Sequence, residues 1–151
     1  MAFADALIAA CDADVVLVDR RDRPGGHWND AYPFVRLHQL SAFYGVNSRM
    51  LSGDSIDTAG PNAGLYERAT AAQLCGYYQR VLDEHLLASG RVRFFGMCDC
   101  LGGGPGERRF VSRLTGETPR CGCGAGSWMP GIWRPRSRRP TSSFGTEPGR
   151  G

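Results

Sequence analysis

The apolar run VVLV at residues 15–18, which ends directly at the acidic residue Asp19, constrains the fold more than any other segment. A short, continuous run of β-branched and apolar residues is typical of a parallel strand that is buried on both faces. The Ala-rich segment 2–10 carries apolar residues at helical spacing, which predicts a helix that has no capping side chain at its start. The order of helix, buried strand and carboxylate is the feature of this segment that says most about the fold.

A second helix is predicted from residue 70 to a stop at Gly90. Thr70 and Gln73 have the spacing of a capping box, in which each side chain binds the backbone N–H of the other residue. A glycine after the last apolar position is a common C-terminal stop. Apolar residues build one face of this helix, at Leu74, Tyr78, Val81, Leu82 and Leu86.

Residues 91–95 and 109–114 alternate between apolar and polar side chains, which predicts two strands on either side of a Gly-rich turn at 102–106. Loops are predicted at 20–26 and 47–66, and irregular structure near a site is predicted at 32–46. Because a helix that leads into a returning strand is typical of α/β proteins, we expect an α/β fold.

The position of Asp19 fits one element of a dinucleotide-binding unit. In such a unit the first strand ends in G-x-G-x-x-G, and an acidic residue about 20 positions later accepts hydrogen bonds from ribose hydroxyls. Counting back from Asp19 places the glycine loop before Met1, so we expect the chain to begin inside the motif. The alternative for Asp19 alone is a solvated carboxylate at the end of a strand.

The segments that follow Asp19 are Gly25-Gly26-His27-Trp28, Tyr32-Pro33 and Arg36-Leu37-His38. This pattern resembles the flavin-dependent monooxygenases, the group that includes flavin-containing and Baeyer–Villiger-type enzymes. His38 stands where Baeyer–Villiger-type enzymes often have Asp, which disfavours that subfamily. The resemblance covers residues 1 to about 117. It implies a partial Rossmann-like FAD-binding domain at 1–117 that lacks its first strand and glycine loop.

The resemblance also implies a set of cofactor-binding residues. The acidic residue would bind the ribose of the FAD adenosine, and the two glycines would let the ribityl chain and the pyrophosphate approach, because glycine has no Cβ. The alternative is an ordinary turn with core aromatic residues under a loop. The implied residues are Asp19, Arg20, Gly25, Gly26, His27, Trp28, His38 and Gln39.

The activity implied by the resemblance is that of an FAD-dependent, NAD(P)H-using oxidoreductase, a monooxygenase acting on a small-molecule substrate. After residue 117 no second glycine fingerprint for a nicotinamide nucleotide follows. Without the first strand and the glycine loop, the pyrophosphate site at the helix N-terminus is missing as well. We therefore expect a fragment of such an enzyme that is inactive by itself.

Residues 118–151 differ in composition from the rest. They hold 6 arginines against one acidic residue, whereas 1–117 holds 12 arginines against 14 acidic residues, and all 18 basic residues are Arg. Gly, Pro and Arg together predict a disordered tail. A basic tail with Trp128 and Trp133 could bind nucleic acid, but out-of-frame translation after a frameshift near Thr118 explains it better, so nucleic acid is not expected as a partner.

Six cysteines include the pairs Cys98-x-Cys100 and Cys121-x-Cys123, whose spacing is not the usual C-x₂₋₄-C of zinc sites. We expect neither a metal nor disulfides. No apolar run reaches the roughly 20 residues of a membrane span, and no signal peptide is recognisable. These features predict a cytoplasmic protein without membrane contact.

Overall fold

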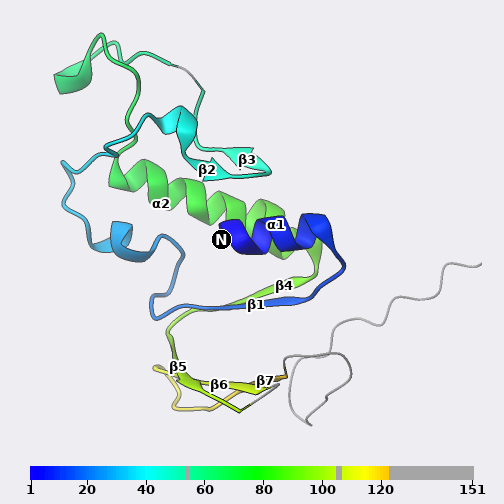
Figure 1. Cartoon of the computed structure of the whole chain (residues 1–151). Coiled ribbons are helices and arrows are strands. Elements are labelled where there is room, and N and C mark those ends of the chain that lie inside the picture. The colour runs from blue at the N-terminus through cyan, green and yellow to red at the C-terminus, as the bar shows by residue number, and fades with distance from the viewer. Residues whose placement is uncertain (54, 105–106, 123–151) are drawn as a thin grey trace, which may run out of the picture.

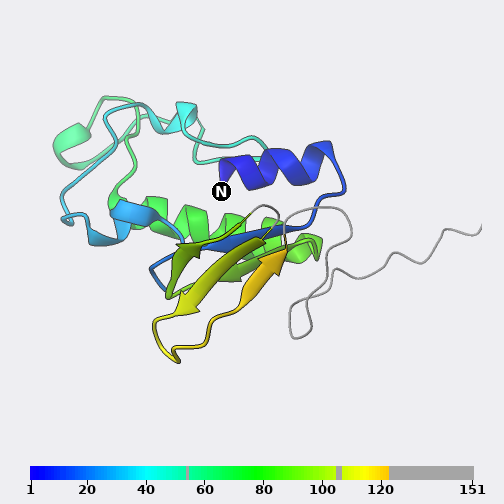
Figure 2. The ribbon, with the colours of Figure 1, turned by 60° about the horizontal axis from the view of Figure 1, so that its bottom comes forward.

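The computed structural model describes residues 1–53, 55–104 and 107–122. Two parallel strands, β1 (Val15–Val18) and β4 (Val92–Phe95), lie between two helices on one side and a three-stranded sheet on the other (Figures 1 and 2). The helices are α1 (Ala2–Ala10) and α2 (Ala71–Arg80). The described residues therefore form a mixed α/β fold, as expected.

Strand β1 pairs with β4 in parallel, with Val15 opposite Val92 and Val18 opposite Phe95. Helix α2 lies in the long connection between them, so the predicted order of strand, helix and returning strand is confirmed. Strand β1 is only half-buried, however, and Val18 is exposed at 36%. The prediction of burial on both faces was wrong for this strand: Val15 and Leu17 pack against the core, whereas Val18 at the end of the strand stays exposed.

Helix α2 begins at the predicted capping box: the Gln73 N–H donates to Thr70 Oγ1, and the Thr70 N–H donates to Gln73 Oε1 at 2.7 Å. The helix continues through a π-helical segment, η4 (Val81–Leu86), and a 3₁₀ turn, η5 (Leu87–Ser89). Gly90 follows in the left-handed conformation at φ 68°, which confirms the predicted stop.

The main core lies between the two helices and the β1–β4 pair. Four side chains of the long helix, Tyr77, Val81, Leu82 and Leu86, are each at most 2% exposed. Their neighbours in the cluster include Ala4, Ile8, Val46 and Val92. Three residues of the predicted apolar face, Val81, Leu82 and Leu86, belong to this cluster, and Tyr77, which was not predicted for that face, joins them. Burial of these side chains holds α1 and β4 against α2.

The segment predicted as loop at 47–66 contains part of a small hairpin, β2 (Gly45–Val46) and β3 (Arg49–Met50). Gly45 has φ 152°, and a Cβ there would lie 2.9 Å from the Arg49 carbonyl oxygen. Two short 3₁₀ helices lie in the rest of the region predicted as loop or irregular, η2 (Ser41–Phe43) and η3 (Gly60–Asn62). A third, η1 (Gly26–Asp30), begins at the last residue of the loop predicted at 20–26.

The second sheet corrects the predicted pairing of the last strands. Strand β6 (Glu107–Ser112) pairs with β5 (Cys98–Gly102), a strand that the sequence did not predict, and not with residues 91–95. Phe110 of β6 packs against Phe95 of β4, with ring centroids 4.9 Å apart. This contact connects the two sheets. Residues 91–95 contribute to the parallel pair, and β5 occupies the position beside β6 that was predicted for them.

Strand β7 (Arg120–Gly122) pairs with β6 and carries the described fold past the predicted boundary at residue 117. The rest of the predicted tail lies outside the described residues, as do Cys123, Trp128 and Trp133. Within the described part of the chain, no helix is long and apolar enough to cross a membrane.

Candidate functional site

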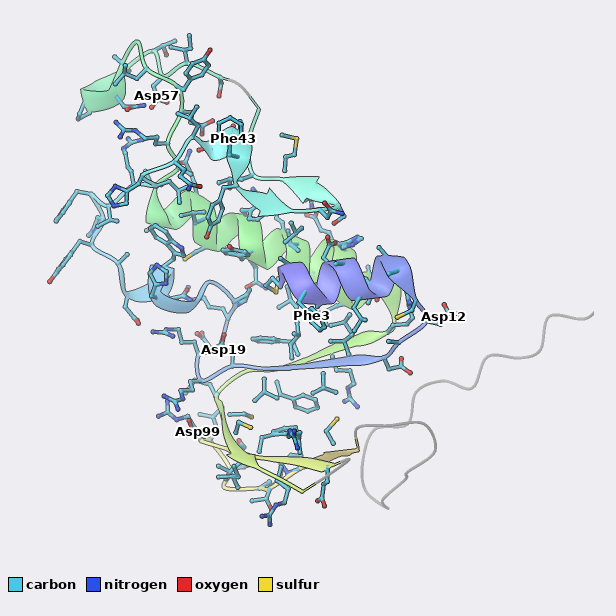
Figure 3. All side chains as sticks on the ribbon, in the orientation of Figure 1. Phe3, Asp12, Asp19, Phe43, Asp57 and Asp99 are labelled. Carbon is cyan, nitrogen blue, oxygen red and sulfur yellow. The ribbon has the colours of Figure 1, made fainter. Side chains whose placement is uncertain are left out.

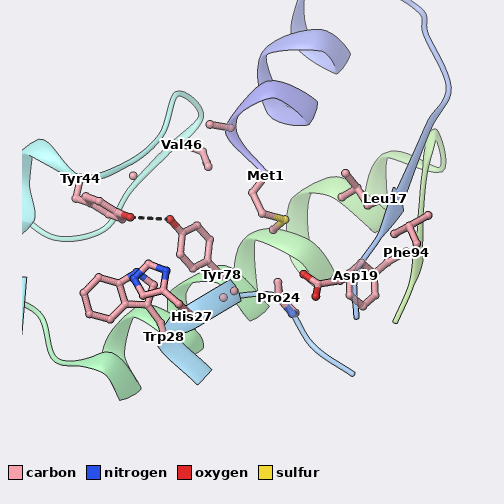
Figure 4. Close-up of a pocket in the computed structure, with 15 residues that line it drawn as sticks. Met1, Leu17, Asp19, Pro24, His27, Trp28, Tyr44, Val46, Tyr78 and Phe94 are labelled. Atoms are coloured by element: carbon pink, nitrogen blue, oxygen red, sulfur yellow. Dashed lines mark hydrogen bonds between the residues drawn. The ribbon is translucent and has the colours of Figure 1, made fainter. Parts of the chain in front are cut away.

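A pocket of about 390 Å³ opens at the carboxyl end of β1. Figure 4 shows that segments distant in the sequence meet around it: the start of α1, the end of β1, the loop at 24–28, the β2 hairpin and α2. Five predicted cofactor-binding residues line it, namely Asp19, Gly25, Gly26, His27 and Trp28. The structure thus brings together residues that the sequence placed in one motif.

Asp19 occupies the polar end of the pocket. Its backbone N–H donates to the Phe95 carbonyl oxygen at 3.0 Å, which continues the β1–β4 ladder and holds the residue at the strand end. Its Oδ1 atom accepts a hydrogen bond from the Arg21 N–H at 2.9 Å. Among the described residues Oδ2 accepts no further hydrogen bond, so one carboxylate oxygen is available to a ligand.

The Gly25-Gly26 turn forms the pocket wall next to Asp19. Both residues have positive φ angles, 121° and 54°, which suit glycine. The Asn29 side chain holds the turn by donating to the carbonyl oxygens of Pro24 and Gly26, each at 3.2 Å. A Cβ on Gly25 would lie 3.0 Å from Asn29 Nδ2. The turn therefore depends on glycine for both conformation and space.

Aromatic side chains line the other end of the pocket. His27 and Trp28 are in ring contact, with centroids 4.8 Å apart. The Tyr78 hydroxyl donates to the Tyr44 hydroxyl at 3.2 Å, a pair drawn in Figure 4. Burial raises the pKa of Tyr78 above its usual range, and the bond to Tyr44 adds to the shift, so this hydroxyl keeps its proton at neutral pH.

Sequence reasoning missed Tyr44, Tyr78 and Met1 as lining residues. Tyr78 was assigned to the apolar face of the helix, and it does contact the main core. The hydroxyl of Tyr78 was the feature of the sequence that could have indicated a site, because a tyrosine directed into a protein interior needs a hydrogen-bond partner for its O–H. The hairpin that carries Tyr44 to this place was not recognisable from local pattern.

Three predicted cofactor-binding residues do not line the pocket: Arg20, His38 and Gln39. The Arg20 side chain is 77% exposed, and its Nε lies 3.2 Å from Asp99 Oδ1. In Figure 3, Asp99 lies on β5, below β1 in that view. His38 and Gln39 are exposed beside the buried Leu37, because Leu37 points into a second apolar cluster with Ala69 and Leu74.

In the part of the chain that the structure describes, no three side chains of His, Cys, Asp or Glu lie together so that they could hold a metal ion. Of the cysteines described there, Cys11, Cys75, Cys98 and Cys100 are free thiols. Burial raises the pKa of Cys98. This cysteine therefore behaves as a small core residue and not as a thiolate.

The chain is similar to long mycobacterial proteins. The uncharacterized protein Rv2000 of Mycobacterium tuberculosis is 54% identical over 104 residues, which are 69% of this chain and 19% of that protein. The uncharacterized protein Mb2023 of Mycobacterium bovis shows the same identity and the same shares. The chain therefore spans about a fifth of the length of these relatives. No family model matches the chain, and no solved structure matches it.

The pocket combines one carboxylate acceptor, a glycine turn and aromatic faces. A carboxylate accepts hydrogen bonds from paired hydroxyls, and aromatic rings offer stacking surface to a planar ring. Within the described lining residues, no nucleophile lies beside a base that would activate it. The arrangement is suited to binding a polyhydroxylated, partly planar ligand.

Proposed function

We propose that this chain forms the adenosine-ribose side of an FAD site in an FAD-dependent, NAD(P)H-using oxidoreductase of the monooxygenase type. The observation that carries the proposal is the position of Asp19, at the carboxyl end of β1 and in the wall of the pocket that Gly25 and Gly26 also line. The substrate would be a small molecule.

The parallel strand pair supports the proposal. In open α/β sheets, ligands bind at the carboxyl ends of the strands, and in Rossmann-like units an acidic residue at the end of the second strand receives the ribose. Here the parallel pair β1–β4 is linked through α2, and the pocket lies at the carboxyl end of β1. The oxygen of Asp19 that accepts no bond from described residues would accept from the ribose hydroxyls.

The size and shape of the pocket fit part of the cofactor. Pockets for small ligands range over about 300–1,000 Å³, and about 390 Å³ is near the lower limit. That volume suits a nucleoside with its first phosphate and not a complete dinucleotide. A Cβ on Gly26 would meet no atom within 4 Å. Because Gly26 has no side chain in that open space, the backbone of the turn can approach a ribose or phosphate closely.

Each part of the pocket has a separate task in this proposal. When bound, FAD supplies the redox chemistry, with NAD(P)H as its reductant. Asp19 would orient the ribose, and the glycine turn, which lines the same pocket, would lie beside the first phosphate. Trp28 and Tyr78 exclude water from the aromatic end, where the Tyr78 hydroxyl stays protonated and can only donate or accept a hydrogen bond.

Equilibrium dialysis of FAD against the 151-residue chain tests the proposal, with Asp19→Asn as the variant. Loss of a charged hydrogen-bond acceptor is expected to weaken FAD binding by about ten- to a hundredfold. Asp14→Asn is the matched control, since Asp14 is an exposed carboxylate just before the same strand. ADP should compete with FAD and FMN should not, because FMN lacks the adenosine. Equal affinities of the two variants, or no FAD binding by the native chain, would reject the proposal.

A further inference from the structure

A second pocket of about 200 Å³ lies along helix α2 and shares no lining residue with the pocket at Asp19. The helix contributes Ala72 and Gly76, which are neighbours four positions apart on the same side of α2. Leu51, which follows the β2–β3 hairpin, and Ala69, which precedes the capping box, complete the apolar lining. Because these side chains are small or apolar, the polar character of the pocket comes from its other lining residues.

Glu67 provides the negative charge of this pocket. Its Oε2 accepts hydrogen bonds from the hydroxyls of Ser52 and Ser55, the second at 2.8 Å. Its Oε1 accepts a longer bond from Gln73 Nε2, at 3.4 Å. The three donors are neutral, and no cation of the described residues forms an ion pair with this carboxylate. The carboxylate is therefore held in place and its charge is available to a cationic ligand group.

Arg80 provides the positive charge of this pocket. Its Nη1 atom lies 3.6 Å from the position that a Cβ on Gly76 would take, so the side chain runs back along α2, as helical side chains do. Glu84, one turn after Arg80, pairs with Arg49 at 2.5 Å. Among the described residues the Arg80 guanidinium has no hydrogen bond or ion pair, so its N–H donors are available to an anionic ligand group.

The two charged groups are displaced from each other along the helix. Gln73, which binds Glu67, precedes Gly76 by three residues, a rise of about 4.5 Å. Within the described structure, Glu67 and Arg80 form no ion pair with each other. A ligand that reaches both needs an ammonium group, whose N–H groups donate to a carboxylate, and a carboxylate of its own, which the guanidinium fork binds. A short apolar chain would separate the two.

The volume of the pocket limits the length of that chain. About 200 Å³ corresponds to about seven water molecules at about 30 Å³ each. 4-Aminobutyrate, with its three methylene groups, is a ligand of this size. An α-amino acid carries both charged groups on one carbon and cannot place them as far apart.

We propose that the pocket along α2 binds a short ω-amino carboxylate, with the ligand's ammonium group on Glu67 and its carboxylate on Arg80. Ala72 and Gly76 contact the methylene chain between the two ends. The site is separate from the proposed FAD site and does not depend on it.

Isothermal titration calorimetry of the full chain with 4-aminobutyrate tests the site. One molecule is expected to bind per chain. Butyrate lacks the ammonium group and butylamine lacks the carboxylate, so each is expected to bind at least about tenfold more weakly. Glycine should also bind more weakly, because its two charged groups are too close together.

Two variants remove one charge each and keep most of the shape. Arg80→Gln and Glu67→Gln are each expected to weaken 4-aminobutyrate binding at least about tenfold. In Glu67→Gln the amide oxygen can still accept from the serine hydroxyls, so the local structure should remain. Arg109→Gln is the matched control, since Arg109 is exposed on β6 in the other sheet. Thermal unfolding shows whether each variant is folded.

Gly76→Ala separates binding from folding. Alanine favours a helix interior over glycine, and its Cβ would meet only Arg80 Nη1, at an ordinary contact distance of 3.6 Å. The variant should therefore unfold at a higher temperature than the native chain. It should nevertheless bind 4-aminobutyrate more weakly, because the added Cβ occupies space beside the guanidinium.

Three results would overturn the proposal. The first is the absence of 4-aminobutyrate binding by the native chain. The second is equal affinity for butyrate or butylamine, which would show that one charge alone is recognised, and equal affinity for glycine would contradict the separation of the two ends. The third is unchanged affinity in folded Arg80→Gln or Glu67→Gln. Binding of 4-aminobutyrate without binding of FAD would support this site and reject the FAD site.

Discussion

The Tyr77 hydroxyl accepts a hydrogen bond from the Val46 N–H at 2.6 Å and donates one to the Arg49 carbonyl oxygen. One side chain of α2 thereby closes both strands of the β2–β3 hairpin onto the helix. The hairpin carries Tyr44 and Val46 into the pocket wall. This bond therefore connects the stability of the core with the shape of the candidate site.

Tyr77→Phe is expected to lower the free energy of unfolding by about 1–3 kcal/mol, because the Val46 N–H would be left buried without a partner. Urea unfolding followed by circular dichroism measures the change. Tyr66→Phe is the control, since Tyr66 is 49% exposed and the loss of its hydroxyl should have little effect. Equal stability of the two variants would show that the hydroxyl is not needed.

The carboxylate of Asp19 should distinguish between adenosine nucleotides. A phosphate on the ribose 2′ oxygen would bring negative charge against the carboxylate, as like charges repel at short distance. AMP is therefore expected to displace FAD from the chain, and adenosine 2′,5′-bisphosphate is expected to displace it at least about tenfold less well. Competition dialysis measures both. Equal competition by the two nucleotides would contradict the assignment of Asp19 to the ribose.

Gly25→Ala should destabilise the chain by about 1–3 kcal/mol, because the φ angle of 121° is unfavourable for alanine and the Cβ would press on Asn29 and Cys75. Gly26→Ala is the matched variant. Its Cβ would meet nothing within 4 Å, so it should cost about 1 kcal/mol, from the positive φ alone. Thermal unfolding of both proteins measures the difference, and a larger effect at Gly26 would contradict it.

Thr70→Ala is expected to cost about 1 kcal/mol, the usual value of an N-cap side chain. The Thr70 side chain accepts from the Gln73 N–H at 3.3 Å, and the variant would leave that N–H without its cap. Thr58→Ala, at an exposed loop position, should be nearly neutral. Urea unfolding of the two variants distinguishes a working cap from a solvated side chain.

Burial alone would raise the pKa of Asp5, but hydrogen bonds from Ser48 and the nearby His85 lower it below its usual value, which makes stability depend on acid pH. A carboxylate whose pKa is lower in the folded state stabilises the fold above its unfolded-state pKa, about 3.9 for aspartate. This stabilisation is lost as the pH falls through the lower, folded-state value. Asp5→Asn should therefore flatten the decline in unfolding free energy below about pH 4, and Asp14→Asn should leave it unchanged. An identical acid profile for the native chain and Asp5→Asn would contradict the lowered pKa.

Much of the local structure was predictable because neighbouring residues decide it. The capping box at Thr70, the stop at Gly90 and the strand that ends at Asp19 were found in the sequence and are present in the structure. The pairing of β5 with β6 was not predictable. Residues 91–95 have the same alternation as a hairpin strand, and only their contact with β1 places them elsewhere.

The sequence by itself determined the two main helices, the strand at 15–18 and the strands that overlap 91–95 and 109–114. It also determined which acidic residue and glycine pair follow the first strand. The tertiary structure decided which of the predicted site residues share a pocket. Asp19, Gly25 and Trp28 converge there, whereas burial of Leu37 leaves His38 exposed outside it. The physical reason is how far apart the contacting residues lie in the sequence. Caps and turns form between residues a few positions apart, whereas a pocket requires packing between segments distant in the chain.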